Sequence, residues 1–173
     1  CAMLLVAGIA TAEAQNVTVG LLGGMGKDPE ATFKKLYDAR FKACQTGYND
    51  NWTQKDADLL KELQAKYDIK ISTLMCLTPN CRWNFTEGPS TIGLVPPLNR
   101  VKYLDLHKRA VDFCAMAGIP AMHSHFGFIP EEPTNELYPG FIEVMRDLCQ
   151  YAKDKGVGIE DLEKARKPMY TTG

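Results

Sequence analysis

Two histidines, His123 and His125, lie two residues apart in the apolar segment 119–127 (IPAMHSHFG). If this segment is a strand, its period of two places both imidazoles on the same face. Imidazole is suited to metal ligation, to proton transfer and to hydrogen bonding with hydroxyl groups. We predict a functional site at the end of this strand, where βα proteins gather their ligand-binding groups. A pair of structural histidines with satisfied hydrogen bonds is the alternative interpretation.

The residues after this segment suit a site at a strand end. Gly127 allows a sharp turn or the close approach of a ligand, and Pro130 stiffens the chain. Glu131 follows, and a carboxylate there can bind a metal ion or accept a proton, although a solvated glutamate is the alternative. The third histidine, His107, lies on the flank of an expected helix, so we predict it at the surface or its boundary.

The charge and the glycine pattern argue against two classes of function. The net charge is −1 and the isoelectric point about 6.3, with Lys and Arg scattered along the chain. No basic stripe is therefore available for a phosphate backbone, and we expect no nucleic-acid partner. The segment 20–27 (GLLGGMGK) meets neither the Walker nor the dinucleotide-binding spacing, so a flexible loop is predicted there.

Short apolar runs alternate with amphipathic stretches, which is typical of βα units and a parallel sheet. Asp28 and Pro29 suit the start of one helix, and Thr53 with Asp56 resembles the capping box of another. The sequence predicts four βα units. The expected strands are residues 17–22, 48–52, 69–77 and 119–127, the second assigned by position only, and the expected helices are residues 29–46, 53–67, 100–117 and 139–155.

One long segment, residues 78–99, has no regular periodicity and contains four prolines together with Trp83 and Phe85. Irregular segments of this length are usually functional or disordered in compact domains. The two aromatic residues favour a functional loop.

The first residues differ from the rest of the chain. Residues 1–10 are almost wholly apolar, and Ala12-Glu-Ala14 has the small-x-small form of a signal-peptidase site. We predict that residues 1–14 are the remnant of a signal peptide and that the protein is exported to the periplasm. A hydrophobic first strand or helix in a cytoplasmic protein is the alternative. The run is too short to span a bilayer, so no membrane partner is expected.

Three motifs occur in order: WNFxxGPxTIGLVP at residues 83–96, then Arg100, then HFGFIPE at residues 125–131. Their order and spacing resemble a branch of the sugar phosphate isomerase/epimerase family, related to xylose isomerases and endonuclease IV. The resemblance covers roughly residues 40–156. It implies an α/β fold, a partial (β/α)8 TIM barrel in residues 15–158 that corresponds to the N-terminal half. Residues 159–173 are predicted to form an irregular tail.

The resemblance also implies a site at the C-terminal mouth of the barrel, for a small sugar or sugar phosphate and a divalent metal ion (Mn, Mg, Co or Zn). Its implied residues are His125 and Glu131 for catalysis, Trp83, His123 and Arg100 for substrate, and His125 and Glu160 for metal. Arg100 and Glu131 are also expected to hold the loops around the site. A smaller residue is expected at position 123. Glu160 follows a Val-Gly-Ile run that is short for a barrel strand, and residues 159–166 read as the start of a helix.

The implied reaction is isomerisation or epimerisation by metal-assisted proton transfer next to a carbonyl group. A complete barrel takes about 250 residues, and the family's last four strands, with their carboxylates, are not found. We therefore expect the chain to be weak or inactive alone, with open sheet edges that a homo-oligomer would cover. A non-catalytic carbohydrate-binding domain, or a hydrolase or lyase on the same barrel, is the alternative.

Overall fold

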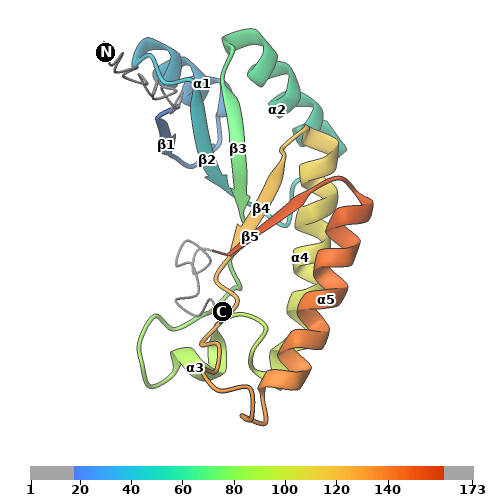
Figure 1. Cartoon of the computed structure of the whole chain (residues 1–173). Coiled ribbons are helices and arrows are strands. Elements are labelled where there is room, and N and C mark those ends of the chain that lie inside the picture. Colours follow the sequence, from blue (N-terminus) through green and yellow to red (C-terminus); the bar gives the residue numbers. More distant parts are fainter. Residues whose placement is uncertain (1–17, 162–173) are drawn as a thin grey trace, which may run out of the picture.

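The fold is built on one parallel sheet (Figure 1). The computed structural model describes residues 18–161, with side chains as far as Ile159. Each strand pairs with the next one along the chain, which is the order of a (β/α) barrel and confirms the predicted partial barrel. The strands are β1 (Gly20–Leu22), β2 (Ala43–Gly47), β3 (Lys70–Met75), β4 (Ala121–Ser124) and β5 (Gly158–Asp161).

Helices α1 (Pro29–Asp38) and α2 (Gln54–Tyr67) begin where the sequence provides capping residues. Asp28 Oδ1 accepts a hydrogen bond from the amide of Ala31, and Thr53 with Asp56 forms the predicted capping box. Gly118 ends a helix in the left-handed conformation, with φ 68°. The helices are α1 (Pro29–Asp38), α2 (Gln54–Tyr67), α3 (Gly88–Thr91), α4 (Pro97–Ala117) and α5 (Tyr138–Asp154).

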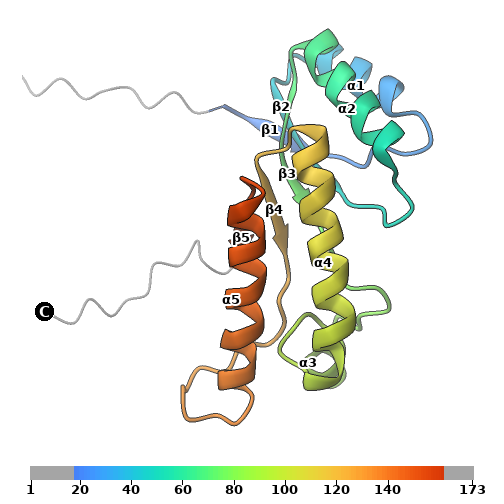
Figure 2. The same ribbon diagram turned by 90° about the vertical axis from the view of Figure 1, so that its right-hand side faces the viewer.

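The core lies between the sheet and its helices. Helices α4 and α5 run side by side along one face of β4 and β5 (Figure 2). The burial of large apolar side chains between these layers is the main source of stability. The largest fully buried ones include Phe33, Leu60, Leu74, Phe113, Met122 and Leu148. Across residues 18–161, every helix is too short or too polar to cross a membrane.

The predicted first helix is too long at its C-terminal end. Helix α1 ends at Asp38, and the segment that follows is β2, whereas the predicted strand at residues 48–52 does not form. In β2, Cys44 and Thr46 are buried, whereas Ala43, Gln45 and Gly47 are half-buried. This alternation has the period of a strand. Cys44 matched the spacing of the apolar residues of α1 in the sequence, although it belongs to a strand. Both pack into the same hydrophobic core.

The predicted boundary at residue 158 is also wrong, because β5 runs across it. Strand β5 pairs with β4, with Glu160 aligned to His123, so this run is a strand rather than the start of a helix or an irregular tail. In the described sheet, β1 and β5 form the two edges. The homo-oligomer expected to cover them stays a prediction. Residues 1–14, expected to be a leader, and residues 162–173 of the predicted tail lie outside the described residues.

The prediction that His107 lies at the surface or its boundary is wrong. Its side chain is fully buried where α4 packs on β4. Its Nδ1 lies 2.5 Å from the carbonyl oxygen of Tyr103, and its Nε2 lies 2.9 Å from Ser124 Oγ. Ser124 Oγ also donates a hydrogen bond to the carbonyl of Cys76. These bonds connect α4 to β4 and to the end of β3. Burial lowers the pKa of His107, although the Tyr103 carbonyl opposes this shift.

We predict that the protein loses stability as the pH falls below about 6.5, the usual histidine pKa. The pKa of His107 is lower in the folded state, so the unfolded chain binds more protons in this range, and acid favours unfolding. The slope is up to about 1.4 kcal/mol per pH unit for one such group. Urea unfolding between pH 5 and 8 measures it. His107→Gln should reduce the slope to the share of His123, whose pKa burial also lowers, and an unchanged slope in that variant would contradict the assignment.

Candidate functional site

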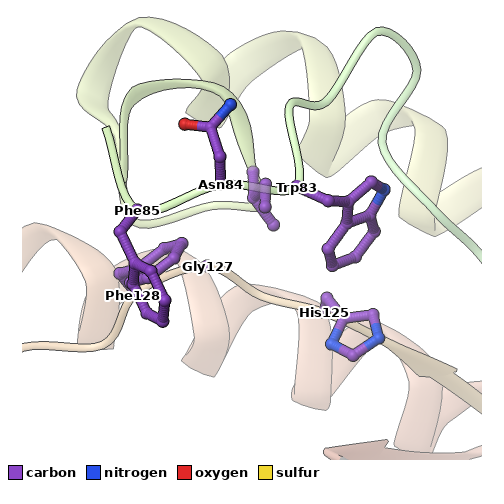
Figure 3. A pocket seen from close by; sticks show the side chains of 7 residues that line it. Trp83, Asn84, Phe85, His125, Gly127 and Phe128 are labelled. Carbon is purple, nitrogen blue, oxygen red and sulfur yellow. The ribbon is translucent and has the colours of Figure 1, made fainter. Parts of the chain in front are cut away.

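A pocket of about 280 Å³ lies at the carboxyl ends of β3 and β4 (Figure 3). Its walls come from the loop after β3 and from the segment that follows β4. We name it the aromatic pocket and define it by its lining residues: Trp83, Asn84, Phe85, Ile92, His125, Gly127 and Phe128. The volume is near the lower end of the roughly 300–1,000 Å³ of small-molecule sites.

Two aromatic pairs form the aromatic pocket. The ring centroids of Trp83 and His125 are 4.9 Å apart, and the two planes meet edge to face at 77°. Phe85 and Phe128 form a second edge-to-face pair at 6.2 Å. Trp83 is 60% exposed, Phe85 91% and Phe128 40%. Aromatic rings left open to solvent beside a cavity indicate a binding surface.

Asn84 shapes the loop between the two aromatic residues. Its Oδ1 accepts hydrogen bonds from the amides of Thr86 (3.0 Å) and Glu87 (2.7 Å). Its Nδ2 donates to Glu87 Oε2 at 3.1 Å. These local bonds turn the chain sharply, as asparagine commonly does in turns. The Asn84 side chain therefore holds Trp83 and Phe85 in place, although it lines the aromatic pocket itself.

The loop docks on the end of β4 through its backbone. The amides of Leu94 and Val95 donate to the carbonyl of Phe126 at 2.7 and 3.2 Å. Gly93 (φ 70°) and Gly127 (φ 114°) face each other at this contact in conformations that favour glycine. A side chain at either position would overlap the opposite backbone. The two glycines allow the approach that brings Trp83 to His125.

Arg100, predicted to bind substrate and to hold the loops around the site, does fasten the loops. Its Nε donates to the carbonyl of Leu94 at 3.2 Å, and its Nη2 donates to the carbonyls of Val95 (2.9 Å) and Leu137 (3.0 Å). The guanidinium joins the loop after β3 to the loop before α5. It does not line the aromatic pocket.

His123 lies within β4, whereas His125 follows the end of this strand, and His123 does not line the aromatic pocket. It is only 2% exposed. The amide nitrogen of Gln45 lies 2.6 Å from its Nε2, and Thr73 Oγ1 lies 3.1 Å from its Nδ1. Burial lowers the pKa of His123, and the charge of His125 adds to this effect. These contacts connect β2, β3 and β4.

The two carboxylates predicted for the site are placed differently. Glu131 is exposed and does not line the aromatic pocket. Glu160 is aligned with His123 across β4 and β5, at the carboxyl end of the described sheet. Among the described residues, no three His, Cys, Asp or Glu side chains come together as metal ligands.

Several residues of the site were not predicted. Gln45 had been assigned to a helix, and it is aligned with Thr73 because the register between β2 and β3 shifts after Cys44. Phe128 was part of the resemblance, but its pairing with Phe85 requires the folded loop. The sequence signal that could have identified Gln45 was its place, as a polar residue, in a short segment that alternates with the period of a strand.

Comparisons with known proteins are now informative. The family model of the xylose isomerase-like TIM barrel matches residues 26–170. No curated protein matches the chain. The solved structures that resemble it include a xylose isomerase domain protein from Planctomyces limnophilus, which is 19% identical with a TM-score of 0.74. That similarity covers 83% of this chain and 52% of the other.

Two further structures show the same fold. A D-allulose 3-epimerase from Methylomonas sp., in complex with D-allulose, is 18% identical with a TM-score of 0.56, over 82% of this chain and 50% of that one. An AP endonuclease of family 2 from Brucella melitensis is 12% identical with a TM-score of 0.60, over 82% and 53%. The chain thus spans about half the length of these proteins.

We predict that Gly127→Ala undocks the loop, because the new Cβ would lie 2.6 Å from the carbonyl oxygen of Ile92 at an unfavourable φ. The expected loss of stability is about 1–3 kcal/mol, measured by urea unfolding, with increased cleavage of the loop by a protease. Gly24→Ala is the matched control, since nothing lies within 4 Å of its Cβ position. Equal stability of the two variants would refute the docking role.

Proposed function

Because the chain belongs to the xylose isomerase-like TIM barrel family, we propose that its aromatic pocket binds a small sugar or its phosphate for isomerisation or epimerisation. The main observation in support of this proposal is that the rings of Trp83 and His125 contact each other at the carboxyl end of the sheet. Barrel enzymes bind their substrates at this end. An aromatic ring suits the C–H face of a sugar, and an imidazole suits its hydroxyl groups. The neighbour that holds D-allulose is consistent with this ligand class.

In this proposal His125 does the proton chemistry. It is the titratable side chain that lines the aromatic pocket, half-buried against Trp83. It would hydrogen-bond a hydroxyl or carbonyl oxygen of the sugar and hold or move a proton there. Trp83 would cover the sugar and exclude water from that side. Glu131 is the second candidate for proton transfer, and reaching the sugar would require its segment to turn toward the pocket.

A divalent metal ion (Mn, Mg, Co or Zn) belongs to the proposal, with His125 and Glu160 as its candidate ligands in this chain. Such an ion would supply a positive charge for an oxygen of the substrate. Two ligands fall short of the three that catalytic sites commonly use, and residues 18–161 contain no cluster that supplies the third. We therefore assign no step to the metal and expect weak or no turnover by this chain alone.

The second candidate function is carbohydrate binding without catalysis. It is favoured by the chemistry of the lining, in which His125 is the one titratable side chain. Removal of metal ions with a chelator distinguishes the enzyme from the binding protein. Sugar affinity that is unchanged by a chelator, with no product formed, would favour the binding protein. Product formed by the metal-loaded chain would favour the enzyme.

We predict that Trp83→Ala weakens binding of D-allulose by about tenfold, because it removes the ring that would cover the sugar. Isothermal titration calorimetry on the full chain measures the dissociation constant. His125→Ala should weaken binding by a similar factor through loss of hydrogen bonds to the sugar.

Trp52→Phe is the matched control for the tryptophan. Trp52 packs against Phe113 with ring centroids 5.0 Å apart and does not line the aromatic pocket. Its substitution should leave the affinity unchanged. Equal affinities of wild type and Trp83→Ala would exclude the aromatic pocket as the sugar site.

The metal proposal predicts weak Mn²⁺ binding that depends on both candidate ligands. His125→Ala and Glu160→Gln should each weaken Mn²⁺ binding in calorimetry, because each removes a donor from an incomplete set. Glu131→Gln is the comparison, since Glu131 is exposed outside the aromatic pocket. Tight Mn²⁺ binding that survives the first two substitutions would place the metal elsewhere.

A further inference from the structure

Resting on the proposed sugar site, we infer that the aromatic pocket selects an uncharged sugar and discriminates against its phosphate ester. The two ligands share their hydroxyl groups and differ by a phosphate that carries nearly two negative charges at neutral pH. The charges around the aromatic pocket determine which of the two ligands binds more tightly.

The lining provides no permanent positive charge. Its side chains are aromatic or apolar apart from Asn84 and His125. Phosphate groups are usually bound by arginine or lysine, or by several backbone amides at a helix N-terminus. The polar end of Asn84 is already occupied by Thr86 and Glu87 of its own loop. The lining therefore contains no arginine or lysine that could hold a phosphate.

Two arginines lie near the aromatic pocket: Arg82 is exposed and does not line it, and Arg100 is already bound. Arg100 uses its Nε and Nη2 for the carbonyls of Leu94, Val95 and Leu137. Its Nη1 lies against Gly140, where even an added Cβ would overlap it. Moving the guanidinium to a phosphate would break three hydrogen bonds that hold the loops of the site.

The segments on either side of the aromatic pocket are acidic on balance. The loop that carries Trp83 has Arg82 and Glu87, both exposed, and the segment between Phe128 and α5 adds Glu131, Glu132 and Glu136. These two segments thus carry one arginine and four glutamates. A dianionic ligand would be repelled by this excess, whereas a neutral sugar would not.

The open aromatic faces strengthen the preference. Phe85 and Phe128 border the cavity with exposed ring surface, and in Figure 3 they lie beside one another across from the pair of Trp83 and His125. The C–H face of a sugar gains by covering such rings. A phosphate held against them would lose its hydration without a compensating partner.

Fluorescence of Trp83 provides the test. The chain contains two tryptophans, so Trp52→Phe leaves Trp83 as the single reporter. D-allulose, D-allulose 6-phosphate and inorganic phosphate are titrated into this variant. We expect D-allulose to quench the emission and the phosphate ester to bind at least about tenfold more weakly, with no response to inorganic phosphate.

The outcomes separate the inference from the proposed function. Equal or tighter binding of the phosphate ester would overturn the inference and keep the sugar site. Absence of binding by both sugars would overturn the sugar site, and the inference with it. Quenching by inorganic phosphate alone would show an anion site and overturn the inference.

A charge introduced at the rim tests the cause. Phe85→Arg adds a cation, and Phe85→Gln removes the same ring without adding charge. The ratio of the two dissociation constants, ester to free sugar, should fall by about tenfold in the arginine variant relative to the glutamine variant. Equal ratios in the two variants would show that charge does not govern the selection and would overturn the inference.

Discussion

The contact between the loop after β3 and the end of β4 is the constraint on which the site depends. Two amides, of Leu94 and Val95, share the carbonyl of Phe126, and two glycines let the backbones approach this closely. The loop carries Trp83 and Phe85, whereas His125 and Phe128 belong to the segment after β4. Each wall of the aromatic pocket therefore has its position only because the backbones are joined. Hydrogen bonds between main-chain atoms form a rigid scaffold, and this scaffold fixes the positions of the side chains that line the pocket.

The two histidines illustrate how position along one strand decides function. His123 lies within the sheet and is bonded to Gln45 and Thr73, whereas His125 lies beyond the strand end beside Trp83. Burial lowers the pKa of His123, and its two contacts connect three strands. His125 lines the aromatic pocket. One imidazole supports the sheet and the other supplies the chemistry that we propose, although the residue type is the same.

The sequence predicted those elements whose own residues specify them. The capping residues Asp28, Thr53 and Asp56 started two helices as expected, because a cap forms with its own next turn. The boundary between α1 and β2 was missed because apolar residues on a helix and on the following strand pack into one core and can share a spacing. Strand β5 was missed because four residues alone carry too little pattern. Its pairing with β4 requires the sheet to exist.

By itself, the sequence determined that the chain is a run of βα units with an aromatic loop and a histidine-bearing strand end, because period and composition are local properties. It also determined the family, through motifs at fixed spacing. Tertiary structure alone decided which carbonyls Arg100 binds, that His107 is buried, and that Glu131 lies outside the aromatic pocket. The physical reason is that a side chain's role depends on which partners lie within hydrogen-bonding distance, and these partners come from distant segments. For His107 the partner across the core is Ser124, and for Arg100 it is the carbonyl of Leu137.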